Sequence, residues 1–167
     1  MPEPSLLDDL YRDILLNHYR APRNRGAGVA PTCAADGSNP LCGDTVRIEV
    51  KVEDGRIAEI TFSGSGCSIS QASASMMTEF VKGRTVAEAL AGVEAFQQMM
   101  VTAQAPTLDG FDDIEALVGV AKFPARVKCA SLAWKTLEQA LHEGGPAGAL
   151  ASTQVTTDER SPTHGGR

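Results

Sequence analysis

Three cysteines far apart in the sequence share one local setting, a turn or a helix start among small and polar residues: Cys42, Cys67 and Cys129. Thiols in such settings can reach a ligand, whereas inert structural cysteines usually lie inside apolar runs. Asp44, two residues after Cys42, adds a carboxylate oxygen. Three sulfurs and one oxygen are enough to complete a tetrahedral metal shell. We therefore predict that these four side chains converge on one metal site.

This donor set suits two kinds of metal group. Zinc prefers thiolate ligands and tolerates a carboxylate oxygen, and a small iron–sulfur cluster is also held by thiolates. An oxygen ligand in place of a fourth thiolate should make the metal ion or the cluster easier to release, because a hard carboxylate oxygen suits these metals less well than a soft thiolate does. The competing interpretation is that the three cysteines serve packing and never meet, and their spacing matches no short zinc-ribbon pattern.

Two basic residues, Arg126 and Lys128, flank the third cysteine at the start of a predicted helix. A cation there lowers a thiol pKa and could steady a persulfide or an exposed thiolate. The alternative is an ordinary solvated helix end. Cys33 is different, because it lies among small residues of a predicted strand, and we expect it to be a core residue.

The histidines do not extend this donor set. His18, His142 and His164 lie on the first helix, at the end of the last helix and in the C-terminal segment, and none is adjacent to a cysteine. We predict that each is an exposed polar residue and not a ligand.

The elements that position these residues follow from hydrophobic periodicity. Alternation of apolar and polar residues predicts strands at 32–35, 46–52 and 57–62, with Asp54-Gly55 as a hairpin turn. Cys42 then lies in the loop between the first two strands. Helical spacing predicts helices at 5–20, 67–82, 85–100, a short one at 112–118, and a last one from Pro124. Cys67 therefore starts a helix, where the dipole favours a thiolate, and Cys129 lies near the start of another.

The order of these elements indicates a single α+β domain at 1–143, with a three-stranded antiparallel sheet and helices packed on one face. Residues 144–167 are rich in Gly, Ala, Ser, Thr and Pro and show no periodicity, which predicts a disordered C-terminal tail. There is no internal repeat.

Composition limits the functional classes. The chain has 167 residues, a formal charge of -6 and a pI near 5.0, so it lacks the basic footprint that non-specific nucleic-acid binding needs. No N-terminal segment has the pattern of a signal peptide, and no apolar run is long enough to span a membrane. We expect a cytoplasmic protein, whose four cysteines favour metal or thiol chemistry over disulfides.

Five sequence blocks resemble the iron–sulfur cluster assembly proteins of the IscU/NifU N-terminal family. They lie at 10–24, 39–44, 64–70, 72–77 and 123–130, and the similarity covers about residues 5 to 142. The SufU branch is the most similar, because Lys128 stands where the scaffold branch typically has a histidine ligand. The stretch at about 100 to 123 also looks like the insertion that SufU-type members carry.

The resemblance implies a zinc ion on Cys42, Asp44, Cys67 and Cys129, and a cysteine desulfurase of the SufS type as partner. Cys42 would accept the persulfide sulfur, so the chain would act as a zinc-dependent sulfurtransferase-type partner with no expected activity of its own. The resemblance also implies downstream cluster scaffolds or carrier proteins as further partners. The alternatives are a scaffold that assembles a transient [2Fe–2S] cluster on the same ligands and, from another class, a structural zinc module with a protein-binding surface.

Overall fold

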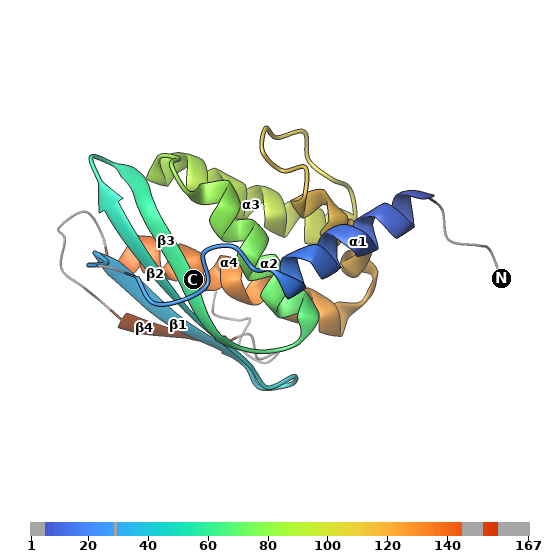
Figure 1. The fold of residues 1–167 in the computed structure, drawn as a ribbon, viewed down its shortest axis with the longest axis horizontal. Coiled ribbons are helices and arrows are strands. Elements are labelled where there is room, and N and C mark those ends of the chain that lie inside the picture. Colours follow the sequence, from blue (N-terminus) through green and yellow to red (C-terminus); the bar gives the residue numbers. More distant parts are fainter. Residues whose placement is uncertain (1–5, 29, 145–151, 157–167) are drawn as a thin grey trace.

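The computed structural model describes residues 6–28, 30–144 and 152–156, and Figure 1 shows their arrangement. The elements in chain order are α1 Leu6–Arg20, β1 Cys33–Asn39, β2 Asp44–Glu53, β3 Arg56–Ser65, α2 Ser68–Val81, α3 Val86–Thr102, the 3₁₀ helix η1 Ile114–Lys122, α4 Pro124–Gly144 and β4 Ser152–Thr156. The predicted three-stranded antiparallel sheet and the helices are confirmed. The main difference in the helices is η1, which begins and ends later than the helix predicted at 112–118.

The sheet has the strand order β3-β2-β1-β4, in which β1, β2 and β3 are antiparallel neighbours. The hairpin between β2 and β3 turns at Asp54 and Gly55, whose φ angles of 54° and 76° are both left-handed. A two-residue hairpin turn whose twist matches that of its flanking strands requires positive φ values at both of its central residues. Along β2, Val46, Ile48 and Val50 are buried, so one face of the sheet forms the core.

β4 is the element that the sequence did not predict. It pairs in parallel with β1, with Ala34 opposite Ser152 and Ser38 opposite Thr156. The expectation of a disordered tail at 144–167 therefore does not hold for residues 152–156. The segments 145–151 and 157–167 lie outside the described residues. A segment of five residues without periodicity is hard to predict as a strand from its own sequence, because its strand conformation depends on pairing with a neighbouring strand.

The helices lie together on one side of the sheet (Figure 1). α4 packs on β1 and β2, and α2 packs on β3, while α1, α3 and η1 cover these two helices. Trp134, Phe62 and Phe96 are the largest fully buried side chains of this core. The predicted site residues lie in the turn between β1 and β2, at the start of β2, at the N-terminus of α2 and in the first two turns of α4.

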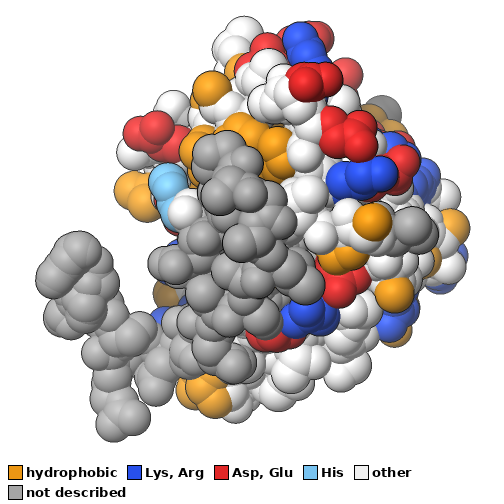
Figure 2. All heavy atoms as spheres, turned by 90° about the vertical axis from the view of Figure 1, so that its left-hand side faces the viewer, with side chains coloured by type: hydrophobic (Ala, Val, Ile, Leu, Met, Phe, Trp, Pro, Cys, Tyr) orange, Lys and Arg blue, Asp and Glu red, His pale blue; other side chains and the backbone are white. Residues whose placement is uncertain are grey.

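The surface agrees with the acidic composition. On the face shown in Figure 2, Lys and Arg side chains are interspersed with Asp and Glu and do not form one basic field. Among the described ranges, no helix combines the length and the apolar character needed to cross a membrane.

Candidate metal centre

The structure brings two of the three predicted thiols into direct contact. Cys42 lies in the turn between β1 and β2, and Cys129 lies in the second turn of α4, with their Sγ atoms 3.2 Å apart. One carboxylate oxygen of Asp44, the first residue of β2, completes a group whose donor atoms all lie within 4.8 Å of one another. Residues 42, 44 and 129 therefore converge as the sequence predicts.

Asn39, at the end of β1, holds the turn that presents Cys42. Its backbone oxygen accepts hydrogen bonds from the N–H groups of Cys42 at 3.2 Å and Gly43 at 2.8 Å. Its side-chain oxygen accepts from the N–H of Leu41 at 3.3 Å, and its amide nitrogen lies 3.7 Å from Cys129 Sγ. Sequence reasoning did not select Asn39, although Asn before Pro40 is a turn signal. Its contact with Cys129 has no local signal at all.

Cys67 is the N-cap of α2, as its position in the sequence predicts. Its sulfur accepts the N–H of Ser70 at 3.5 Å, and its own N–H donates to Asp44 Oδ1 at 2.9 Å. The Cys67 sulfur lies 3.9 Å from Asp44 Oδ2, but Cys67 is not part of the group of donor atoms within 4.8 Å. The ligand role of Cys67 is therefore still a prediction, although the residue adjoins the group through Asp44.

The three site cysteines differ in exposure. Cys42 is exposed, Cys67 is half-buried and Cys129 is buried. Burial raises the pKa of the Cys129 thiol above its ordinary value. Hydrogen bonds with Cys42 and Asp44 raise this pKa further because they favour the protonated thiol, and the nearby negative charge of Cys67 adds to the effect. In metal-free protein Cys129 therefore holds its proton at neutral pH.

This difference predicts the order in which the thiols react. In metal-free folded protein, iodoacetamide should alkylate Cys42 before Cys129, because the thiolate is the nucleophile and Cys129 is both buried and protonated. Peptide mass spectrometry over a time course measures the order. Rapid labelling of Cys129 in protein that is still folded would contradict the arrangement.

The donor set fits a zinc ion. Asp44 is 1% exposed, and no Lys, Arg or His of the described residues forms an ion pair with it. A buried carboxylate beside two thiols is a costly arrangement unless a cation compensates it. Sulfur and carboxylate ligands are also those that zinc accepts. Cys42, Asp44 and Cys129 could hold the ion, with Cys67 as the nearest candidate for a fourth ligand.

Gly66 is needed for the position of the Asp44 carboxylate, and we expect Gly66→Ala to weaken metal binding. A Cβ at position 66 would lie 2.6 Å from Asp44 Oδ1 and 3.0 Å from its Cγ, so the carboxylate would have to move. Disturbing the orientation of a ligand typically lowers metal affinity about 10- to 100-fold. A zinc titration against a chelator measures this effect. Gly119→Ala is the matched control, since a Cβ there meets nothing within 4 Å, and equal affinities in the two variants would refute the prediction.

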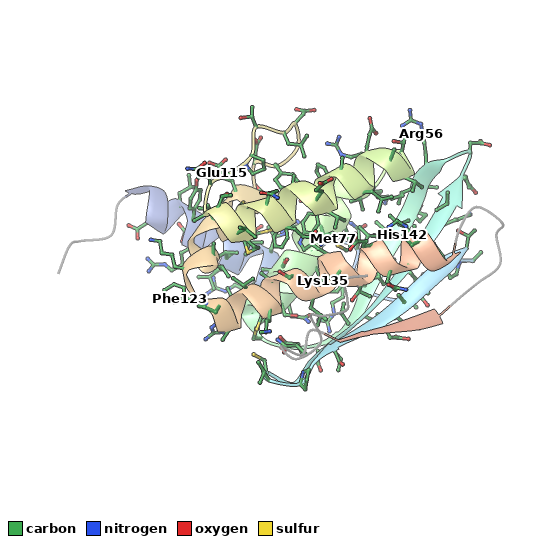
Figure 3. The ribbon with its side chains drawn as sticks, turned by 180° about the vertical axis from the view of Figure 1, so that it is seen from behind. Arg56, Met77, Glu115, Phe123, Lys135 and His142 are labelled. Atoms are coloured by element: carbon green, nitrogen blue, oxygen red, sulfur yellow. The ribbon has the colours of Figure 1, made fainter. Side chains whose placement is uncertain are left out.

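The remaining predicted residues have mixed outcomes. Cys33 is 1% exposed and belongs to the core, as predicted. Arg126 is exposed and Lys128 is half-buried, and among the described residues neither forms a hydrogen bond with a site cysteine. His142 is exposed, as predicted, and Figure 3 shows it at the opposite end of the molecule from Phe123, which precedes α4. His164 lies outside the described residues.

The prediction that His18 is an exposed polar residue is wrong. Its side chain is buried, and its Nδ1 lies 2.7 Å from Ser75 Oγ while its Nε2 lies 2.9 Å from Asp113 Oδ2. These partners satisfy both ring nitrogens, which allows a polar ring to be buried. They belong to α2 and to the segment before η1, so the sequence around His18 does not reveal them.

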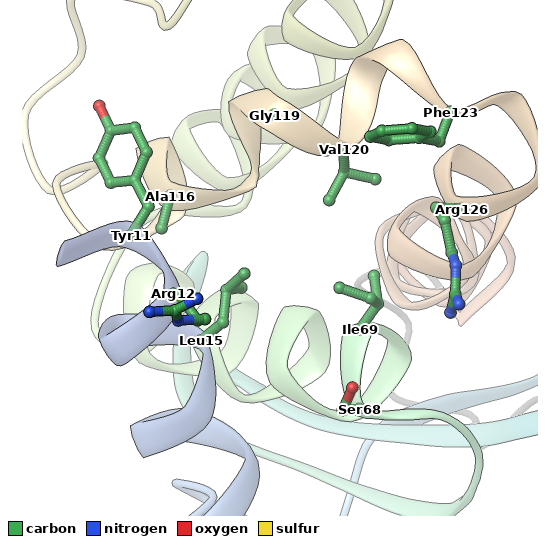
Figure 4. A pocket seen from close by; sticks show the side chains of 10 residues that line it. All are labelled: Tyr11, Arg12, Leu15, Ser68, Ile69, Ala116, Gly119, Val120, Phe123 and Arg126. Carbon is green, nitrogen blue, oxygen red and sulfur yellow. The ribbon is translucent and has the colours of Figure 1, made fainter. Parts of the chain in front are cut away.

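A largely apolar pocket of about 400 Å³ lies between α1, the start of α2, η1 and the start of α4 (Figure 4). α1 contributes Leu15, α2 contributes Ile69, and the exposed ring of Phe123 lies between η1 and α4. Arg12 and Arg126 lie on two sides of the pocket in Figure 4. Ser68, which follows Cys67 at the start of α2, also lines the pocket, so the pocket adjoins the segment that carries Cys67.

Comparison with known proteins identifies the family. Residues 10–144 match the model of the NifU-like N terminal domain. The chain belongs to this family. It is 45% identical over 141 residues to the zinc-dependent sulfurtransferase SufU of Bacillus subtilis, covering 83% of this chain and 95% of that protein.

Two further relatives agree with this assignment. The iron–sulfur cluster assembly scaffold protein IscU of Streptococcus pyogenes serotype M1 is 39% identical over 153 residues, covering 90% of this chain and 94% of that protein. The crystal structure of a nitrogen-fixing NifU-like protein (N-terminal) from Brucella abortus superimposes with a TM-score of 0.73 at 26% identity, covering 83% of this chain and 96% of that one. The predicted resemblance to the IscU/NifU N-terminal family is thus confirmed.

Proposed function

We propose that this protein takes part in iron–sulfur cluster assembly by accepting a persulfide sulfur at Cys42 from a cysteine desulfurase of the SufS type. The observation that carries the proposal is the exposure of Cys42 beside the buried pair Cys129 and Asp44. The similarity to SufU, named a zinc-dependent sulfurtransferase, supports the same assignment. A cytoplasmic location belongs to this proposal.

In the proposed reaction the Cys42 thiolate attacks the outer sulfur of the persulfide on the desulfurase. A bond forms between Cys42 Sγ and that sulfur while the S–S bond of the donor breaks, and its electron pair leaves with the donor thiolate. The transfer is a thiol exchange without net oxidation or reduction. Cys42 can approach a partner because it is exposed in the turn between β1 and β2, whereas Cys129 is buried.

We propose Cys42, Asp44, Cys67 and Cys129 as the ligands of zinc. When bound, the ion supplies positive charge that keeps a thiol deprotonated at neutral pH. Asp44 contributes by orienting the group, since its Oδ1 accepts the Cys67 N–H at 2.9 Å. Arg126, exposed in the first turn of α4, and Lys128 would supply cations near an incoming persulfide anion.

A second candidate is a scaffold that assembles a transient [2Fe–2S] cluster on the same ligands. The similarity to IscU of Streptococcus pyogenes, named a scaffold protein, supports it. Anaerobic reconstitution with iron and sulfide should then give a coloured product that transfers its cluster to an apo-ferredoxin. A colourless product under those conditions would favour the sulfur relay.

The test of the relay combines metal analysis with mass spectrometry. Protein purified without added metal should contain one zinc per chain, and incubation with a cysteine desulfurase and cysteine should place the added sulfur on Cys42. A structural zinc module, the alternative from another class, would unfold on metal removal and never carry the added sulfur. Unmodified Cys42 in the presence of an active desulfurase would refute the relay.

A further inference from the structure

A second cluster of metal-ligating side chains lies apart from the cysteines, where α1, α2 and the segment before η1 meet. It consists of His18 in the last turn of α1, Glu79 on α2 and Asp113, with one donor atom of each within 4.8 Å of the others. The described residues contain two groups of potential metal ligands this close together, namely this one and Cys42 with Asp44 and Cys129. The proposed sulfur relay makes no use of the histidine cluster.

The distances in this cluster suit a metal ion. His18 Nε2 lies 2.9 Å from Asp113 Oδ2 and 3.8 Å from Glu79 Oε1. Two ligands bound to a tetrahedral ion at about 2.0 to 2.2 Å lie roughly 3.3 to 3.6 Å apart. The two observed separations fall on either side of this range. Small side-chain shifts would therefore bring all three donor atoms to bonding distance.

The histidine ring is already oriented for such a role. Its Nδ1 lies 2.7 Å from Ser75 Oγ, which also accepts the backbone N–H of Arg23 at 2.8 Å. When Nδ1 carries the proton and donates it to Ser75, the lone pair of Nε2 faces the two carboxylates. A hydrogen bond to the second ring nitrogen is the usual way in which a ligating histidine is held.

The carboxylate side of the cluster is accessible to ions. The His18 side chain is 1% exposed, whereas those of Glu79 and Asp113 are 53% and 48% exposed. A pocket of about 210 Å³ adjoins them, and Asp112 contributes a further acidic side chain to its wall. Its volume leaves room for water molecules that would complete the coordination of an ion.

Two arginines lie near the cluster, and neither blocks it. Arg84 lines the same pocket, but its guanidinium stacks on the Phe80 ring at 4.2 Å and donates to the carbonyl oxygens of Phe80 and Asp109. Arg23 Nε lies 4.0 Å from Glu79 Oε2, which leaves Oε1 as the oxygen that faces His18. The local balance around the pocket is therefore acidic.

We propose that His18, Glu79 and Asp113 form a second metal site, which binds a divalent first-row transition-metal ion with water as additional ligands. The imidazole nitrogen favours such an ion over calcium or magnesium, which prefer oxygen ligands alone. The ion would bind the lone pair of His18 Nε2 in place of the hydrogen bond between His18 and Asp113. Without a sulfur ligand, this site differs in metal preference from the cysteine centre.

Manganese distinguishes the two sites, because Mn²⁺ favours carboxylate ligands and has little preference for thiolates. The experiment titrates the full chain with MnCl₂ and measures free Mn²⁺ by electron paramagnetic resonance. We expect one bound Mn²⁺ per chain and at least about a tenfold loss of affinity in Glu79→Gln and in Asp113→Asn. Both residues are half-exposed, so these variants should fold, and circular dichroism checks this.

Glu94→Gln is the matched control, since Glu94 is an exposed acidic residue on α3 outside the cluster. It should bind Mn²⁺ like the parent chain. Absence of binding to the parent chain, or equal binding in Glu79→Gln, Asp113→Asn and Glu94→Gln, would overturn the proposal. So would a loss of Mn²⁺ binding in Cys42→Ala, because that result would place the ion at the cysteine centre.

Discussion

A Cys42→Ala variant is expected to lose its stimulation of a cysteine desulfurase down to the background of the desulfurase alone. Cys42 is the exposed thiol of the centre, and its Sγ lies 3.2 Å from the buried Cys129, which cannot take over the role of acceptor. Alanine removes the nucleophile and one proposed zinc ligand, while a surface turn tolerates the smaller side chain. The rate of sulfide release from cysteine, with a reductant present, measures the effect.

Cys33→Ala is the matched control for this experiment. Cys33 is buried in the core and lies on β1, so its removal affects packing and leaves the centre intact. Its stimulation should equal that of the parent chain once the folded fraction is matched by circular dichroism. If Cys42→Ala accelerates sulfide release as the parent does, Cys42 is not the acceptor. If Cys33→Ala loses stimulation as well, the loss cannot be assigned to the centre.

The placement of the site residues was predictable because Cys42 and Cys67 stand at breaks between periodic segments and Cys129 lies near the start of a helix. Cys42 follows a turn signal and Cys67 precedes an apolar helical stripe. The β1–β2 turn and the N-termini of α2 and α4 then meet at one end of the sheet, as an α+β arrangement allows. The contact of 3.2 Å between Cys42 and Cys129 depends on the packing of α4 on the sheet, which local sequence does not specify.

His18 and β4 show what the sequence could not reveal. His18 is at the polar end of an amphipathic helix, and it is buried only because Ser75 and Asp113, which are 57 and 95 residues away, satisfy its nitrogens. β4 has no hydrophobic alternation of its own and is identified by its parallel pairing with β1. Both features depend on partners remote in sequence, so local propensity gives no signal for them.

Trp134→Ala is expected to cause a large loss of stability, because it removes the largest side chain of the core. Trp134 is fully buried, its ring stacks on that of Phe96 with the centroids 4.5 Å apart, and its Nε1 donates to Ser73 Oγ at 3.0 Å. Removal of a buried tryptophan side chain typically lowers the free energy of unfolding by about 3 to 5 kcal/mol, because the cavity it leaves closes only in part. Urea unfolding followed by circular dichroism measures this loss.

Two further variants show how much of the loss in Trp134→Ala comes from packing, from the indole hydrogen bond and from general effects on α4. Trp134→Phe should lose less stability than Trp134→Ala, because it retains an aromatic ring against Phe96 and loses mainly the indole N–H. Lys135→Ala, at an exposed neighbour on the same helix, should stay within about 0.5 kcal/mol of the parent chain. A loss below about 1 kcal/mol for Trp134→Ala would show that this core repacks freely.

Trp134→Ala should also affect zinc binding, because α4 carries both Trp134 of the core and Cys129 of the metal centre. A ligand that binds only the folded chain stabilises it by mass action, so a zinc-loaded Trp134→Ala chain should unfold at a higher urea concentration than the metal-free form. The variant should also bind zinc more weakly than the parent, in proportion to its unfolded fraction. Equal unfolding of the loaded and metal-free forms would mean that zinc does not bind preferentially to the folded centre.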